Sequence, residues 1–250
     1  MNSLKDRVAI VTGSAQGIGL GIANSVAHAG GRLVLVDINP SGLEDAVETL
    51  NSSGSEVLGV TADVTKADSI RNMIDQTIDH FGQIDLLVNN AASLILKPIQ
   101  ETSDHDWDQV LDTNLKGTFL TCREVIPHME SRGVGAIVNI SSIAAFAYTT
   151  PHISYAASKA GVSALTRDLA CEVARKGIRV NAIAPGPIQT GMFDSLTQEQ
   201  RDAHAEKIPI GRLGQTSDVG SATVFLASDE ASFITGITLP VAGGSDLKIT

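Results

Sequence analysis

Residues 8–19 read Val8-Ala9-Ile10-Val11-Thr12-Gly13-Ser14-Ala15-Gln16-Gly17-Ile18-Gly19, and the architecture predicted for the chain starts from them. The apolar run Val8–Val11 is typical of a buried strand, and a helical period follows the glycines through Ile22 and Val26. The glycines therefore occupy a strand-to-helix turn, where the missing Cβ lets the backbone approach a ligand closely. The free N–H groups at the start of a helix bind phosphate. The turn predicts a dinucleotide site formed by Gly13, Gln16, Gly17, Ile18 and Gly19.

An acidic residue ends the second apolar run. Leu33–Val36 are apolar, and Asp37 follows, 18 residues after Gly19. A carboxylate at about this spacing accepts hydrogen bonds from the adenosine ribose hydroxyls and repels a 2′-phosphate. Neither Gln16 nor Ile38 supplies a cation that would hold such a phosphate. We therefore predict NAD rather than NADP, with Asp37 and Ile38 beside the ribose; a strand-end cap is the alternative role of Asp37.

Short apolar runs alternate with longer amphipathic segments along the chain. A run that is apolar at nearly every position is typical of a strand buried on both faces. Ile70, Met73, Ile74 and Ile78 form the apolar stripe of one intervening helix. This alternation predicts a parallel sheet with helices on both faces. We expect an α/β, doubly wound Rossmann fold whose seven parallel strands lie at 8–11, 33–36, 57–60, 86–88, 136–140, 179–183 and 237–241.

One domain is expected to span residues 1–250, because no Pro- or Ser-rich linker and no repeat divides the chain. The least regular part is 186–214, which contains Pro187, Gly191 and Pro209. An insertion bracketed by Gly and Pro after a late strand is a candidate lid over a substrate. A surface loop without a gating role is the alternative.

The composition excludes several classes of protein. Among the 250 residues, 18 are Lys or Arg and 28 are Asp or Glu, so the formal net charge is −10 and no basic stripe is present. We therefore expect no nucleic-acid and no membrane partner. Cys122 and Cys171 lack the spacing of a metal site or a disulfide framework, so no metal is expected. Met1–Arg7 lack the apolar run of a secretory signal, and a cytoplasmic location is expected.

Tyr155 and Lys159 lie four residues apart in a helical pattern and so share one helix face. An ammonium beside a phenol favours the phenolate and lowers the pKa of the tyrosine from about 10. Because solvated helix faces carry the same spacing, the pair alone leaves both interpretations open. Ser142 follows the predicted strand 136–140, which places its hydroxyl at the carboxyl end of the sheet, where ligands bind.

Together these motifs resemble those of the short-chain dehydrogenase/reductase family, in its short single-domain branch. The resemblance covers nearly the whole chain, and the order of the motifs makes it specific. It rests on Thr12-Gly13-x-x-x-Gly17-x-Gly19, Asp63-Val64, Asn89-Asn90-Ala91-Ala92, Asn114, Ser142, Tyr155-x-x-x-Lys159 and Asn181-Ala182-Ile183-Ala184-Pro185-Gly186.

The resemblance implies a catalytic set of four residues. In this set Tyr155 is the acid/base, while Lys159 binds the nicotinamide ribose and lowers the tyrosine pKa. Ser142 polarises the reacting oxygen, and Asn114 holds a water that connects Lys159 to solvent. Further cofactor contacts are implied for Asp63, Val64, Asn90, Ala91, Pro185, Gly186, Ile188 and Thr190. For Asn90, a structural tie between two strand ends is also open.

The expected reaction is hydride transfer between NAD(H) and a secondary alcohol or ketone, with Tyr155 exchanging the proton. A 3-oxoacyl-thioester reductase using NADPH and a non-catalytic NAD-binding scaffold are the alternatives. The residues that follow the catalytic motifs are mostly apolar and favour a substrate with a hydrophobic body. The predicted pocket consists of Ser93, Leu94, Ser142, Ile143, Phe146, His152, Tyr155, Met192 and Phe193. His152 either binds a substrate oxygen or has a structural role.

The resemblance also implies a homotetramer, in which the helices expected at 107–129 and 155–175 pack between subunits. The residues themselves show only that both segments are long and apolar on one side.

Overall fold

The structure is a computed structural model that describes residues 3–191 and 197–247; the predicted pocket residues Met192 and Phe193 lie outside the described residues. Its centre is a seven-stranded parallel sheet in the order β3-β2-β1-β4-β5-β6-β7. The strands are β1 (Val8–Thr12), β2 (Arg32–Asp37), β3 (Val57–Thr61), β4 (Leu86–Asn89), β5 (Gly135–Ile140), β6 (Ile178–Pro185) and β7 (Thr238–Val241). The predicted fold class is confirmed, and each predicted apolar run coincides with one strand.

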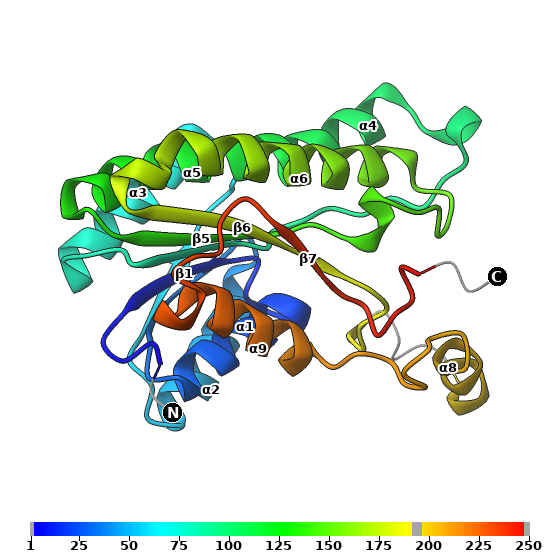
Figure 1. Cartoon of the computed structure of the whole chain (residues 1–250), viewed down its shortest axis with the longest axis horizontal. Coiled ribbons are helices and arrows are strands. Elements are labelled where there is room, and N and C mark those ends of the chain that lie inside the picture. The colour runs from blue at the N-terminus through cyan, green and yellow to red at the C-terminus, as the bar shows by residue number, and fades with distance from the viewer. Residues whose placement is uncertain (1–2, 192–196, 248–250) are drawn as a thin grey trace.

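Helices cover both faces of the sheet (Figure 1). They are α1 (Gly17–His28), α2 (Pro40–Ser52), α3 (Ala67–Phe81), α4 (Asp104–Leu111), α5 (Gly117–Arg132), α6 (Ile153–Val173), α8 (Gln198–Ala205) and α9 (Thr216–Ala227). Helices α1, α2 and α9 lie on one face and α3, α4, α5 and α6 on the other, while α8 lies beyond the end of the sheet. Within the described ranges, none of these helices combines the length and the apolar character that a membrane span requires.

Strand β1 shows how the sheet separates two cores. Val8 and Ile10 belong to the core under α3 and α5, whereas Ala9 and Val11 belong to the core under α1 and α9. All four side chains are buried because successive residues of a strand point to opposite faces. Strands β2, β4, β5 and β6 are buried in the same way.

Two of the predicted strands are not buried on both faces, so the prediction was wrong for them. In β3, only Val60 is buried, and every residue of β7 is partly or fully exposed. The physical reason is their position, because β3 and β7 are the two edges of the sheet and have a neighbour on one side only.

The strand order places the ligand-binding crevice. From β1 the chain first builds outward through β2 and β3, and β4 then pairs with β1 on its other side. The loops that leave β1 and β4 therefore diverge, and a crevice opens between the carboxyl ends of these two strands.

A buried polar chain fixes β4, β5 and their helices near this crevice. The amide of Asn89 donates to Asn139 Oδ1 over 2.8 Å, and the amide of Asn139 donates to Thr166 Oγ1 on α6 over 2.9 Å. Thr121 Oγ1 on α5 donates to Asn89 Oδ1 over 2.6 Å. Because each buried polar atom here has a partner, the chain fixes the position of α6, which carries Tyr155 and Lys159.

Candidate active site

The glycine-rich turn is built as the sequence predicts. Gly13 and Gly17 have φ values of +64° and +59°, a left-handed region that glycine enters without strain. A Cβ on Gly19 would lie 2.1 Å from the carbonyl oxygen of Gly13, so only glycine permits α1 to begin this close to β1. The first turn of α1 therefore faces the crevice with its N–H groups, which is the arrangement that binds pyrophosphate.

Asp37 lies at the end of β2 beside this turn. Its Oδ2 accepts a hydrogen bond from the Ala15 N–H, and its Oδ1 accepts one from the Asn39 N–H, each over 3.0 Å. These bonds hold the carboxylate at the rim of a cavity of about 1130 Å³. Among the described residues that line this cavity there is no Lys or Arg.

Most of the predicted cofactor residues line this one cavity. They are Gly13, Gln16, Gly17, Ile18, Asp37, Ile38, Asp63, Val64, Asn90, Ala91 and Thr190. Gly19 lies behind the turn, where it packs against Gly13. The lining also includes residues that the sequence analysis did not select, among them Asn39, Thr65, Gln109 and Thr113. The carboxylate of Asp63 accepts hydrogen bonds from the N–H and the hydroxyl of Thr65.

Asn90 ties two strand ends together, the structural role left open for it. Its Nδ2 donates to the carbonyl oxygens of Thr12 and Gly13 over 3.0 and 2.9 Å. The hydroxyl of Thr12 in turn accepts hydrogen bonds from the N–H groups of Asn90 and Ala91. The sequence analysis assigned no role to Thr12. A hydroxyl residue at the end of a buried strand was the feature that could have indicated this one.

The catalytic candidates meet at the carboxyl end of β5. Ser142 follows β5, and its hydroxyl accepts a hydrogen bond from the Ala144 N–H over 3.1 Å and also bonds to Tyr155. Lys159 is 2 % exposed, and its Nζ donates to the Ile140 carbonyl oxygen over 2.6 Å. The same Nζ lies 5.6 Å from the centre of the Tyr155 ring. The hydroxyl, the phenol and the ammonium thus form one group.

The charges of this group differ from the prediction. Burial raises the pKa of Tyr155, and the hydrogen bond with Ser142 offsets this only in part. Burial also lowers the pKa of Lys159 to about 8. The prediction that Lys159 lowers the tyrosine pKa is wrong for this structure. The reason is that the protein interior disfavours the charged form of each group, and Nζ is directed to the Ile140 carbonyl oxygen.

Asn114 is buried in a π-helical turn, 112–116, between α4 and α5. Its Oδ1 accepts the Ser93 N–H over 2.7 Å, and its Nδ2 donates to the Ser93 carbonyl oxygen and to Ser158 Oγ, each over 3.0 Å. These bonds connect the loop after β4 to α6 at the residue before Lys159. The predicted water relay through Asn114 stays a prediction. Ser158 was not selected from the sequence.

Of the predicted substrate residues, Ile143 and His152 lie next to this group. Ile143 is buried directly after Ser142, while Leu94 and Phe146 are exposed. His152 is buried directly before α6, and its ring forms a T-shaped pair with the Tyr155 ring, with 5.4 Å between ring centres.

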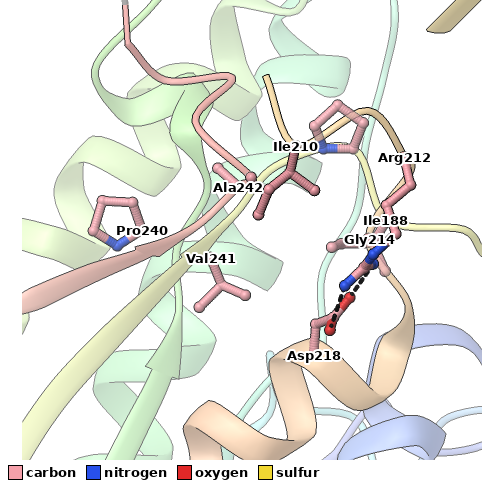
Figure 2. Close-up of a pocket in the computed structure, with 10 residues that line it drawn as sticks. Ile188, Ile210, Arg212, Gly214, Asp218, Pro240, Val241 and Ala242 are labelled. Carbon is pink, nitrogen blue, oxygen red and sulfur yellow. Dashed lines mark hydrogen bonds and ion pairs between the residues drawn. The ribbon is translucent and has the colours of Figure 1, made fainter. Parts of the chain in front are cut away.

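Residues 187–190, which we call the strap, cross from the end of β6 back toward the glycine turn. Gly214 pins the strap: its N–H donates to the Pro187 carbonyl oxygen over 2.9 Å, and its carbonyl oxygen accepts the Gln189 N–H over 2.7 Å. Figure 2 shows the pocket of about 300 Å³ at this junction, where Arg212 and Asp218 form an ion pair beside Ile188 and Gly214. The pair ties the residues before Gly214 to α9. Thr190, at the other end of the strap, lies close to Gly17.

We expect Gly214→Ala to weaken NADH binding about 10-fold, equivalent to about 1.4 kcal/mol. A Cβ at position 214 would lie 2.4 Å from Ile188 Cδ1, so the Ile188 side chain in the strap has to shift. Quenching of protein fluorescence by NADH measures this affinity. Gly54→Ala is the control, since a Cβ there meets nothing within 4 Å; its φ of +88° makes it lose stability without losing NADH affinity. Equal affinities for Gly214→Ala and the wild type would contradict this role of the strap.

Comparisons with known proteins agree with this geometry. Residues 13–246 match the sequence model of a family described as enoyl-(acyl carrier protein) reductase. The chain is 41% identical over 246 residues to (2S)-[(R)-hydroxy(phenyl)methyl]succinyl-CoA dehydrogenase subunit BbsD of Thauera aromatica, covering 98% of each protein. It is 39% identical over 243 residues to the 3-oxoacyl-[acyl-carrier-protein] reductase FabG of Staphylococcus epidermidis, covering 96% of this chain and 98% of FabG. The chain belongs to the short-chain dehydrogenase/reductase family.

A solved structure of the same fold is levodione reductase, with a TM-score of 0.92, 32% identity, and coverage of 98% of this chain and all of that one. As a short-chain dehydrogenase/reductase, the chain is an oxidoreductase of a family that binds a nicotinamide cofactor. The glycine turn, the strap and the Ser142–Tyr155–Lys159 group are the parts of this family member that fit such a cofactor.

Proposed function

We propose that the protein is an NAD(H)-dependent oxidoreductase that interconverts a secondary alcohol and a ketone. The observation that carries the proposal is that Ser142, Tyr155 and Lys159 lie together at the same edge of the sheet as the cavity rimmed by Asp37. The glycine turn, whose backbone a Cβ would block, fits the pyrophosphate of a dinucleotide. The nicotinamide, when bound, supplies or accepts the hydride.

The residues of the chain transfer the proton and position the reacting oxygen. The Ser142 hydroxyl donates a hydrogen bond to this oxygen, and the Tyr155 phenol gives it a proton during reduction. Burial raises the pKa of Tyr155, so the chain by itself keeps the phenol protonated at neutral pH, the form that reduction requires. Oxidation needs the phenolate, and we therefore expect its rate to rise with pH. Asn114 connects this group to the loop after β4.

Asp37 supports NAD as the cofactor. A carboxylate at the end of β2 accepts bonds from ribose hydroxyls and repels a 2′-phosphate. The described cavity lining offers no Lys or Arg to such a phosphate. Asp63, Val64, Asn90 and Ala91 are proposed to contact the adenosine side, and Pro185, Gly186, Ile188 and Thr190 the nicotinamide side.

A second candidate is reduction of a 3-oxoacyl thioester with NADPH. Its support is the 39% identity to FabG and the 41% identity to a dehydrogenase of a CoA thioester. The carboxylate of Asp37 is the feature that opposes NADPH. A non-catalytic scaffold is disfavoured, because Ser142, Tyr155 and Lys159 are all present and lie together.

A screen separates these candidates. Acetophenone, cyclohexanone and acetoacetyl-CoA are offered with NADH and with NADPH, and absorbance of the reduced nicotinamide is followed. We expect NADH to give a kcat/KM at least about 10-fold higher than NADPH, and a ketone to be reduced faster than the thioester. Preference for acetoacetyl-CoA with NADPH would establish the second candidate instead.

Three further features are proposed: a substrate lid, a location and an oligomeric state. Residues 186–214 act as a substrate lid, since the strap and Gly214 close the base of this segment. The protein acts in the cytoplasm as a homotetramer, for which the exposed Trp107 on α4 and Phe119 on α5 supply apolar surface. Elution from a sizing column as a 26.1 kDa monomer would contradict the tetramer.

A further inference from the structure

His152 occupies a position from which it can control the catalytic tyrosine. It directly precedes α6, three residues before Tyr155, and its carbonyl oxygen accepts the Ala156 N–H over 3.0 Å. Its backbone also pairs with that of Lys97 in the loop after β4. The Nζ of Lys97 lies 2.7 Å from Asp106 Oδ2 on α4. The backbone of His152 is therefore held from two sides.

The ring nitrogens of His152 already have partners within the same loop. Nδ1 lies 2.5 Å from Thr150 Oγ1, and Nε2 lies 3.3 Å from Thr149 Oγ1. A neutral imidazole has one donor and one acceptor nitrogen, and a hydroxyl satisfies either. Burial lowers the pKa of His152, which favours this neutral form. The imidazole therefore has no unmet hydrogen bond to offer a substrate oxygen.

The ring of His152 packs against the ring of the catalytic residue in a T-shaped pair. The planes of the His152 and Tyr155 rings meet at 79°, with 5.4 Å between their centres. Lys159 Nζ lies 5.6 Å from the centre of the same tyrosine ring. With Ser142 bonded to its hydroxyl, Tyr155 is confined by three neighbours. Of these, His152 is the aromatic one, and edge-to-face pairs have a preferred geometry.

We propose that His152 is a positioning residue that fixes the ring of Tyr155 for proton transfer and does not bind the substrate. The proposal rests on the proposed function, since it assigns Tyr155 the proton. Of the two roles left open for His152, it takes the structural one over contact with a substrate oxygen. The Thr149 and Thr150 hydroxyls act through it by holding the imidazole in its T-shaped pair with Tyr155.

Two variants separate positioning from substrate binding. His152→Ala removes the ring, and His152→Phe keeps an aromatic ring without nitrogen atoms. If the ring positions Tyr155, His152→Ala lowers kcat for acetophenone reduction 10- to 100-fold with little change in KM, roughly the loss expected from a misplaced catalytic group. In that case His152→Phe lowers kcat only about 3-fold. If both variants raise KM and leave kcat unchanged, the imidazole binds the substrate and the proposal is overturned.

A spectroscopic measurement makes the result independent of turnover. The chain has two tyrosines, so ¹³C labelling of the tyrosine ζ-carbon gives one signal for Tyr155 and one for the exposed Tyr148. We expect His152→Ala, and not His152→Phe, to change the pH at which the Tyr155 signal titrates, while the Tyr148 signal serves as the reference. Identical titrations in the wild type and His152→Ala would overturn the proposal. If the wild type reduces no ketone, the proposed function fails while this measurement still tests His152.

Discussion

Tyr155→Phe is expected to lower kcat for acetophenone reduction about 10³-fold, because the variant lacks the phenol that protonates the forming alkoxide. NADH affinity should stay within about 3-fold of the wild type, since the glycine turn, Asp37 and the strap are untouched. Stopped-flow single turnovers measure the chemical step, and fluorescence quenching measures the affinity.

Tyr148→Phe is the matched control for this experiment. It removes the other phenol hydroxyl of the chain, from a side chain that is 85% exposed. We expect wild-type turnover from this variant. Near-normal turnover by Tyr155→Phe, or equal losses in both variants, would refute the assignment of Tyr155 as the acid/base.

Asp37→Ser combined with Ile38→Arg is expected to reverse the cofactor preference. Loss of the carboxylate removes hydrogen bonds that a charged acceptor makes to the ribose, worth about 1.5–3 kcal/mol each. The added guanidinium supplies a bidentate partner for a 2′-phosphate. With both substitutions present, we expect the ratio of kcat/KM for NADH to kcat/KM for NADPH to fall about 10³-fold. One ketone is used for all measurements.

The control for this variant is Asp45→Ala, which removes a carboxylate from the exposed face of α2 and leaves the cavity unchanged. Its cofactor ratio should equal that of the wild type. Asp37 also accepts hydrogen bonds from the Ala15 and Asn39 N–H groups. We therefore expect the single variant Asp37→Ser to lose activity with NADH without gaining activity with NADPH. An unchanged ratio in the double variant would show that Asp37 acts as a strand-end cap.

The sequence predicts best what short stretches of chain determine. The turn at Gly13–Gly19 was predicted correctly because the positive φ values of Gly13 and Gly17 and the close approach of Gly19 to Gly13 arise within seven residues. The positions of the strands were also predicted correctly, because each apolar run lies within one short stretch of sequence. Burial of β3 and β7 was predicted wrongly, because a run of apolar residues carries no information about which strands lie at the edges of the sheet.

The electrostatics of the site depend on contacts between distant parts of the chain. The i, i+4 spacing correctly places Lys159 near the Tyr155 ring, but the Ile140 carbonyl that receives its Nζ comes from another element. Desolvation then decides the direction of both pKa shifts. Likewise, nothing in the sequence near Ile188 indicates that Gly214 holds it. The threonines that engage His152 are local, and Thr149-Thr150-Pro151-His152 already contained that signal.

The pH dependence of alcohol oxidation shows whether Tyr155 is the group that exchanges the proton. Single turnovers of 1-phenylethanol with NAD⁺ are followed from neutral pH into the alkaline range, because burial raises the pKa of Tyr155. We predict that the wild-type rate rises with pH through one ionisation and that the small residual rate of Tyr155→Phe is independent of pH. The same rise in both proteins would show that another group takes the proton.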